Sequence, residues 1–146
     1  MNNSQPIPAQ QLFQLAGDIG DIADEEPITA DLLEKAAEEL DVPLTHIYAA
    51  LLYDPSLQPE REHEVAFEVC LQRCQFFGSV ATLTDLLALK HQRESEEKPG
   101  FDVVPRGCLD RCDYPPVVCS RSSHGVHLHG QVNAEKLEEL VDGLCS

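Results

Sequence analysis

Four of the six cysteines fall into two closely spaced pairs. Cys70 and Cys74 are separated by three residues, as are Cys108 and Cys112, and 33 residues lie between the two pairs. A 2Fe–2S cluster takes four thiolates, two on each iron, so two loops that each supply a pair of cysteines match its requirements. An iron–sulfur site is therefore the leading interpretation of this spacing.

Three other interpretations of the two pairs stay open at this point. Structural zinc also binds four cysteines, but usually through shorter C-x2-C loops. A catalytic dithiol is usually C-x-x-C, a spacing that neither pair has. The last alternative is that the cysteines are buried or disulfide-bonded without a function. Disulfides are uncommon in cytoplasmic proteins, and residues 1–11 lack the basic and apolar regions of a secretory signal.

Each cysteine pair follows a segment with the pattern of a β-strand. Residues 65–69 alternate between large apolar side chains and Ala or Glu, and they run directly into Cys70. A second short strand is expected over residues 101–104, shortly before Cys108. If the two strands are neighbours in one sheet, the loops that follow them lie together. The four sulfurs can then converge on one site.

A helix is expected between these two strands, with Ser79 as its N-cap. The positive end of that helix dipole follows the first cysteine pair and favours the thiolate form. Two more strands are expected over residues 116–119 and 126–129, and Asn133 caps a final helix. The resulting order, β-α-β-β-β-α, belongs to the α+β class and is the order that a small thioredoxin-like sheet requires.

The region before this sheet has the pattern of a small helical unit. Residues 1–8 contain two prolines and are expected to form a flexible tail. Within residues 9–57, apolar side chains recur at helical spacing in three segments, and Thr29 caps the second of them. We therefore expect an N-terminal helical region over 9–57 and the β-α-β-β-β-α domain over 58–146.

The chain is strongly acidic, with a formal net charge of −16. Such a surface repels nucleic acid and anionic membranes. No apolar run approaches the roughly 18 residues that a membrane-spanning helix needs. None of the glycines forms a G-x-G-x-x-G motif after a strand, so no dinucleotide site is expected. These features predict a cytoplasmic protein that binds no nucleic acid, does not insert into membranes and does not oxidise NADH alone.

Five further residues could suggest additional chemistry. His124, His127 and His129 could form a second metal site, but the last two alternate with apolar residues. They are therefore expected on the outward face of an edge strand. Cys119 lies in a predicted inner strand and is expected to be a buried small side chain. Cys145 has no partner that the sequence identifies.

The cysteine loops resemble those of a known family. The segment Gly107–Val118, GCLDRCDYPPVV, is similar to the second cysteine loop of the thioredoxin-like 2Fe–2S ferredoxins. Val69–Ser79, VCLQRCQFFGS, resembles the first loop, and the C-terminal VNAEKLEELVDGL also matches. Ile28–Tyr53 is similar to the N-terminal helices of one branch. That branch comprises the small ferredoxin-like subunits of NADH:quinone oxidoreductase (respiratory complex I), with relatives in NAD-linked hydrogenases and formate dehydrogenases.

The resemblance implies a set of ligands, a cofactor and a partner. Cys70, Cys74, Cys108 and Cys112 would hold the iron of a 2Fe–2S cluster in the 58–146 domain. The chain would be a non-catalytic electron-carrying subunit of an NADH dehydrogenase-type oxidoreductase, and it could be peripheral to a membrane complex. Residues 9–57 would dock a flavin-containing NADH-oxidising subunit. Two rival functions are an autonomous ferredoxin of the same fold and a zinc-bound or cluster-free structural subunit.

Overall fold

The computed structural model describes residues 7–71, 79–106 and 116–145, and the chain divides into two compact units. The first unit is Ile7–Glu60, and the second contains Arg61–Ser146. Each unit has its own buried core, and each is described separately below. The three expected elements of the first unit and the six of the second are all present.

The first unit is built from three α-helices and a short 3-10 helix. They are α1 (Ala9–Ala23), α2 (Ala30–Leu40), α3 (Leu44–Ala50) and η1 (Leu51–Tyr53). Most of the apolar side chains that the helical spacing places on one side are buried, among them Leu12, Ile19, Leu33 and Ile47, while Leu32 and Leu40 are half-buried. Ile7, within the segment expected to be a loose tail, is also buried.

Local sequence explains where α2 begins and ends. The hydroxyl of Thr29 accepts a hydrogen bond from the amide of Leu32 at 3.2 Å, as expected for an N-cap. Asp31 lies in the first turn, where the helix dipole favours a carboxylate. Asp41 ends the helix in the left-handed conformation, which Asp tolerates better than most residues. The predicted cap is therefore confirmed.

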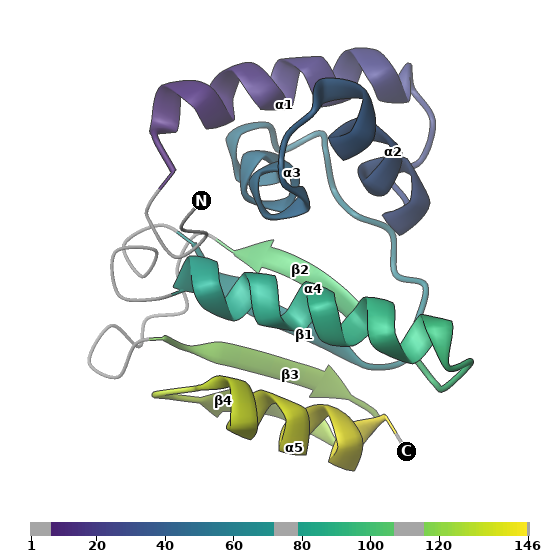
Figure 1. Ribbon diagram of the computed structural model, residues 1–146, viewed down its shortest axis with the longest axis vertical. Coiled ribbons are helices and arrows are strands. Elements are labelled where there is room, and N and C mark those ends of the chain that lie inside the picture. Colours follow the sequence, from purple (N-terminus) through teal and green to yellow (C-terminus); the bar gives the residue numbers. More distant parts are fainter. Residues whose placement is uncertain (1–6, 72–78, 107–115, 146) are drawn as a thin grey trace. The chain divides into compact units, whose positions relative to one another are not determined.

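The second unit is a four-stranded mixed sheet with two helices (Figure 1). Its elements, in chain order, are β1 (Ala66–Cys70), α4 (Ser79–Ser95), β2 (Asp102–Arg106), β3 (Val118–Ser122), β4 (Gly125–His129) and α5 (Ala134–Leu144). The strand order is β2-β1-β3-β4; β1 and β2 are parallel, and the other pairs are antiparallel. This confirms the predicted thioredoxin-like β-α-β-β-β-α arrangement.

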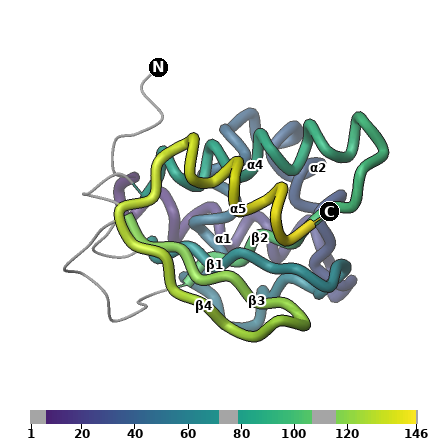
Figure 2. Tube along the Cα trace, turned by 90° about the horizontal axis from the view of Figure 1, so that it is seen from below, coloured from purple at the N-terminus to yellow at the C-terminus, as the bar shows by residue number. Residues whose placement is uncertain are grey.

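Both helices of this unit cover the same face of the sheet. Figure 2 shows α4 and α5 side by side above the strands, and Figure 1 shows them in front of the strands. β1 is central and every one of its residues is buried. The ring of Phe67 from β1 meets that of Phe101 edge to face, with centroids 5.1 Å apart. This contact between two aromatic rings packs β1 against the residue that precedes β2.

Arg93 joins the carboxyl-terminal ends of α4 and α5. Its side chain donates hydrogen bonds to the backbone carbonyls of Pro99 at 2.6 Å and Cys145 at 2.8 Å. It also contacts the carboxylate of Asp142 at 3.2 Å. One nearly buried guanidinium thus satisfies an acceptor in the loop after α4 and two acceptors at the end of α5.

β2 ends two residues later than the sequence suggests. The expected strand ended at Val104, but β2 continues through Pro105 to Arg106. β2 is an edge strand of the sheet, with β1 on one side only among the described strands. Proline is tolerated at an edge, where a missing amide on the outer side breaks no ladder bond.

β4 is an edge strand, as expected, but its two faces are not divided as predicted. His127 is exposed, whereas His129 is half-buried and its Nε2 lies 3.0 Å from the hydroxyl of Ser120. Val126 and Leu128, on the other face, are 54% and 45% exposed. The alternation of apolar and polar residues in this strand therefore does not separate a buried face from an outward one.

Candidate metal centre

The segments that contain the two cysteine pairs begin side by side in the sheet. Strands β1 and β2 are parallel, and their last residues, Cys70 and Arg106, are paired with each other. The amide of Leu71 donates to the carbonyl of Arg106 at 2.9 Å and extends this pairing by one residue. Cys108 follows Arg106 by two positions. The fold therefore brings the start of one cysteine loop next to the start of the other.

The next strand begins at the same end of the sheet. β3 runs antiparallel to β1, and its first residue, Val118, is the partner of Val69. The chain between β2 and β3, which contains the second cysteine pair, thus leaves and re-enters the sheet at the end where Cys70 lies. The predicted convergence of the strand ends is present. Cys70 is buried at the end of β1, while Cys74, Cys108 and Cys112 lie outside the described residues.

A buried hydroxyl lies beside this end of the sheet. Ser79 is the first residue of α4, and its Oγ is buried and makes no hydrogen bond to any part of the chain that the structure describes. The prediction that Ser79 caps the helix through its side chain is therefore wrong. A buried hydroxyl without an acceptor costs free energy. An anionic group bound at the helix N-terminus would supply that acceptor, so the residues fit a thiolate-ligated cluster.

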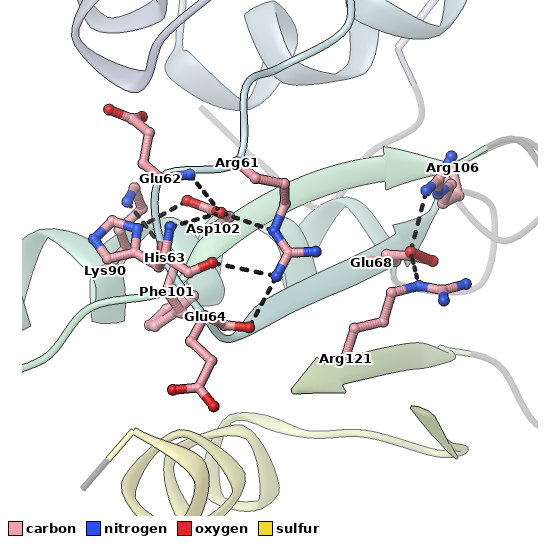
Figure 3. A network of polar contacts seen from close by, with 10 residues as sticks. All are labelled: Arg61, Glu62, His63, Glu64, Glu68, Lys90, Phe101, Asp102, Arg106 and Arg121. Atoms are coloured by element: carbon pink, nitrogen blue, oxygen red, sulfur yellow. Dashed lines mark hydrogen bonds and ion pairs between the residues drawn. The ribbon is translucent and has the colours of Figure 1, made fainter. Parts of the chain in front are cut away.

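Glu68 is the centre of an ion-pair cluster next to Cys70, which the sequence did not predict. Its carboxylate pairs with Arg106 at 3.2 Å and with Arg121, whose Nε donates to the same oxygen (Figure 3). We call these three residues the Glu68 cluster. Glu68 is only 2% exposed. Burial opposes ionisation, but the two guanidinium groups outweigh it and hold the pKa of Glu68 below its usual value.

The remaining described cysteines are buried thiols. Cys119, on β3, is the Cα partner of Glu68, and its predicted burial is confirmed. Desolvation and the nearby Glu68 charge raise the pKa of the Cys119 thiol. Cys145 follows α5, and burial likewise raises the pKa of its thiol. Both thiols are therefore less readily deprotonated than an ordinary cysteine.

The histidines of the β3–β4 hairpin do not form a metal site in the described structure. His127 Nε2 lies 3.4 Å from the carbonyl of His124, while His129 contacts Ser120. Within the described part of the second unit, no three His, Cys, Asp or Glu side chains lie close enough together to hold a metal ion. His127 is exposed, as expected for a surface histidine, whereas His129 is half-buried against Ser120.

A second polar cluster lies at the other end of β2. Asp102 accepts hydrogen bonds from the amides of Glu62 and His63 at 2.9 and 3.1 Å (Figure 3). Its carboxylate also lies 2.8 Å from Nδ1 of His63 and 3.2 Å from Nε of Arg61. Because the Nδ1 position is occupied by this contact, the imidazole orientation is fixed. This cluster anchors the segment that leads into β1.

Comparison with known proteins found likeness only to solved structures. No family model matches the chain, and no curated protein matches it. The wild-type thioredoxin-like 2Fe–2S ferredoxin from Aquifex aeolicus is similar at 23% identity and a TM-score of 0.45, over 55% of this chain and 84% of that one. A second structure of a ferredoxin of this kind from A. aeolicus gives 21% identity and a TM-score of 0.47, over 55% and 78%. A cysteine-to-serine variant gives 23% and 0.46, over 53% and 83%.

Hydropathy along the helices adds one further observation. None of the helices in the part of the chain that the structure describes combines the length and apolar character required to cross a bilayer.

Proposed function

We propose that this chain binds a 2Fe–2S cluster through Cys70, Cys74, Cys108 and Cys112 and carries single electrons. The observation that supports this most directly is the pairing of Cys70 with Arg106, because it places the starts of both cysteine loops at one end of the sheet. Two loops with two thiolates each suit a cluster with two irons. When bound, the cluster supplies one-electron redox chemistry.

The residues around this sheet end would bind the cluster and shape its surroundings. Burial of Cys70 and of neighbouring β1 side chains excludes water from one side of the site. The N-terminus of α4 offers a positive dipole end, and Ser79 offers a hydroxyl hydrogen to a sulfur. Such hydrogen bonds and the local charge are the means by which a protein sets a cluster's potential.

The finer proposal is that the electrons come from NADH through a flavin-containing subunit of the same complex. One support is the resemblance of Ile28–Tyr53 to the N-terminal helices of the small ferredoxin-like subunits of NADH:quinone oxidoreductase. The other is that this sequence has no G-x-G-x-x-G motif for binding a dinucleotide itself. NADH donates an electron pair as hydride, so a flavin must divide the pair before a one-electron cluster can accept. In this proposal the helices of Ile7–Glu60 dock the flavin subunit.

Metal analysis of cysteine variants tests the cluster assignment. Anaerobically purified protein is expected to be reddish-brown, with two irons and two acid-labile sulfides per chain. Cys108→Ser and Cys112→Ser should lose most of the iron. Cys119→Ser and Cys145→Ser are matched controls, because both remove a buried thiol outside the loops, and they should retain it. One zinc without sulfide, or equal iron loss in all four variants, would overturn the assignment.

The NADH-linked role is tested separately by anaerobic bleaching. The loaded protein alone should keep its visible absorbance when NADH is added, and it should bleach once a flavin-containing NADH-oxidising subunit is supplied. Rapid bleaching by NADH alone would show a nucleotide site on this chain. Equal electron transfer to and from several unrelated flavoproteins would instead identify an autonomous ferredoxin.

A further inference from the structure

The Glu68 cluster combines two positive charges with one negative charge at a single buried oxygen. Arg106 and Arg121 both pair with Oε2 of Glu68, so one carboxylate faces two guanidinium groups. One arginine would suffice to neutralise Glu68. The second leaves a net positive charge on this part of the sheet, although the chain as a whole is acidic.

This positive charge lies on the same face of the sheet as Cys70. Side chains two residues apart on a strand share a face, so Glu68 and Cys70 point the same way. Cys70 is the Cα partner of Arg106, and the Arg106–Glu68 ion pair shows that the Arg106 side chain turns back along that face. The guanidinium of Arg106 is therefore held on the strand adjoining Cys70, on the Cys70 face.

We propose that Arg106, positioned by Glu68, raises the reduction potential of the cluster ligated by Cys70. This inference rests on the proposed function. Reduction adds an electron to a cluster that its thiolate ligands already make anionic, and a nearby fixed positive charge stabilises the added charge. Arg106 supplies the charge, and Glu68 is the positioning residue, because its carboxylate holds the Arg106 guanidinium on this face of the sheet.

The structure supplies a matched control at the far end of the same strand pair. Arg61 pairs with Asp102 as Arg106 pairs with Glu68, at 3.2 Å in both cases. The two arginines are 50% and 46% exposed, and their carboxylate partners are 7% and 2% exposed. Asp102 is four residues from Arg106, about 13 Å along an extended strand, which exceeds the screening length of roughly 8 Å at physiological salt.

The experiment compares reduction potentials of the loaded protein by electron paramagnetic resonance titration. Arg106→Gln should lower the equilibrium constant for reduction about threefold to tenfold, which is about 30 to 60 mV for a one-electron couple. Arg106→Lys, which keeps the charge, should stay near the wild-type value. Arg61→Gln should lower the urea stability as Arg106→Gln does, because each leaves a buried carboxylate with fewer partners, but it should not move the potential.

Iron content, measured on every sample, separates the possible failures. If wild-type protein holds no cluster, the proposed function fails, and this inference fails with it. If all variants hold two irons and Arg106→Gln has the wild-type potential, or the same shift as Arg61→Gln, only the inference is overturned. If Arg106→Gln loses iron, Arg121→Gln decides the outcome, because it removes the same net charge from β3. It should give a smaller decrease, and no decrease overturns the inference.

Discussion

Nε2 of His63 lies 2.9 Å from the point where a β-carbon on Gly100 would stand. The other ring nitrogen, Nδ1, is 2.8 Å from the Asp102 carboxylate, so the imidazole cannot move away from Gly100 without leaving Asp102. The absence of a side chain at residue 100 is thus what allows the contact between His63 and Asp102.

Gly100→Ala should therefore destabilise the second unit by about 1–2 kcal/mol through loss of the His63–Asp102 contact. Urea unfolding of the single and double variants measures the coupling. In a His63→Ala background the added methyl meets no ring, and Gly100→Ala should then cost little or even stabilise the fold. Equal costs in both backgrounds would show that the imidazole is not the obstacle.

Arg93→Met should lower the free energy of unfolding by about 2–3 kcal/mol. The substitution keeps much of the apolar stem but leaves the carbonyls of Pro99 and Cys145 without their donor. Lys98→Met is the matched control, because Lys98 pairs with Glu96 in solvent and such pairs contribute little. Thermal or urea unfolding of both variants should show a clear loss only for Arg93→Met.

Ser79→Ala should have opposite effects on the two forms of the protein. In the cluster-free protein the change removes a buried hydroxyl with no acceptor among the described residues, so stability should rise by about 1 kcal/mol. In the loaded protein it removes a hydrogen bond to sulfur, so the reduction potential should fall. A loss of stability in the cluster-free form would show that the hydroxyl already has a partner there.

Stability should fall in mild acid because of His129. Desolvation, followed by the charges of Lys136 and His127, holds the pKa of His129 below its usual value of 6.5. Its contribution is therefore fully present above pH 6.5 and is lost as the pH falls toward the lower folded value. Urea unfolding between pH 7.5 and 5 should show a shallower decline for His129→Gln, whose amide can still reach Ser120. An unchanged decline would assign the effect to other groups.

Alternation of large apolar residues correctly predicted β1, but it did not predict the role of Glu68. The pattern over residues 65–69 places Glu68 among the polar positions, and such positions are usually exposed. Glu68 is nevertheless buried, because Arg106 and Arg121 compensate its charge. These two partners lie 38 and 53 residues away along the chain. No local pattern encodes a contact over such separations, although a glutamate two residues before a predicted ligand was a usable signal.

The spacing of the cysteines and of the expected strands correctly predicted that the two cysteine-containing segments start at the same end of the sheet. The chain order β-α-β favours β1 and β2 as parallel neighbours, and in the structure their last residues, Cys70 and Arg106, are partners. The sequence pattern did not predict where β2 ends, since Pro105 is acceptable in the strand only because β2 is at an edge of the sheet. The roles of Cys74, Cys108 and Cys112 stay predictions, because they fall outside the described residues.

The anchoring of residues 61–63 on Asp102 sets a lower limit on the shortest stretch of chain that can fold as the sheet unit. A fragment that starts at Arg61 keeps both amides, the imidazole and the guanidinium that surround this carboxylate. A fragment that starts at Val65 begins at the first apolar residue of the strand pattern, yet it would leave the Asp102 carboxylate without these four partners. The energetic border of the unit therefore lies ahead of its first strand.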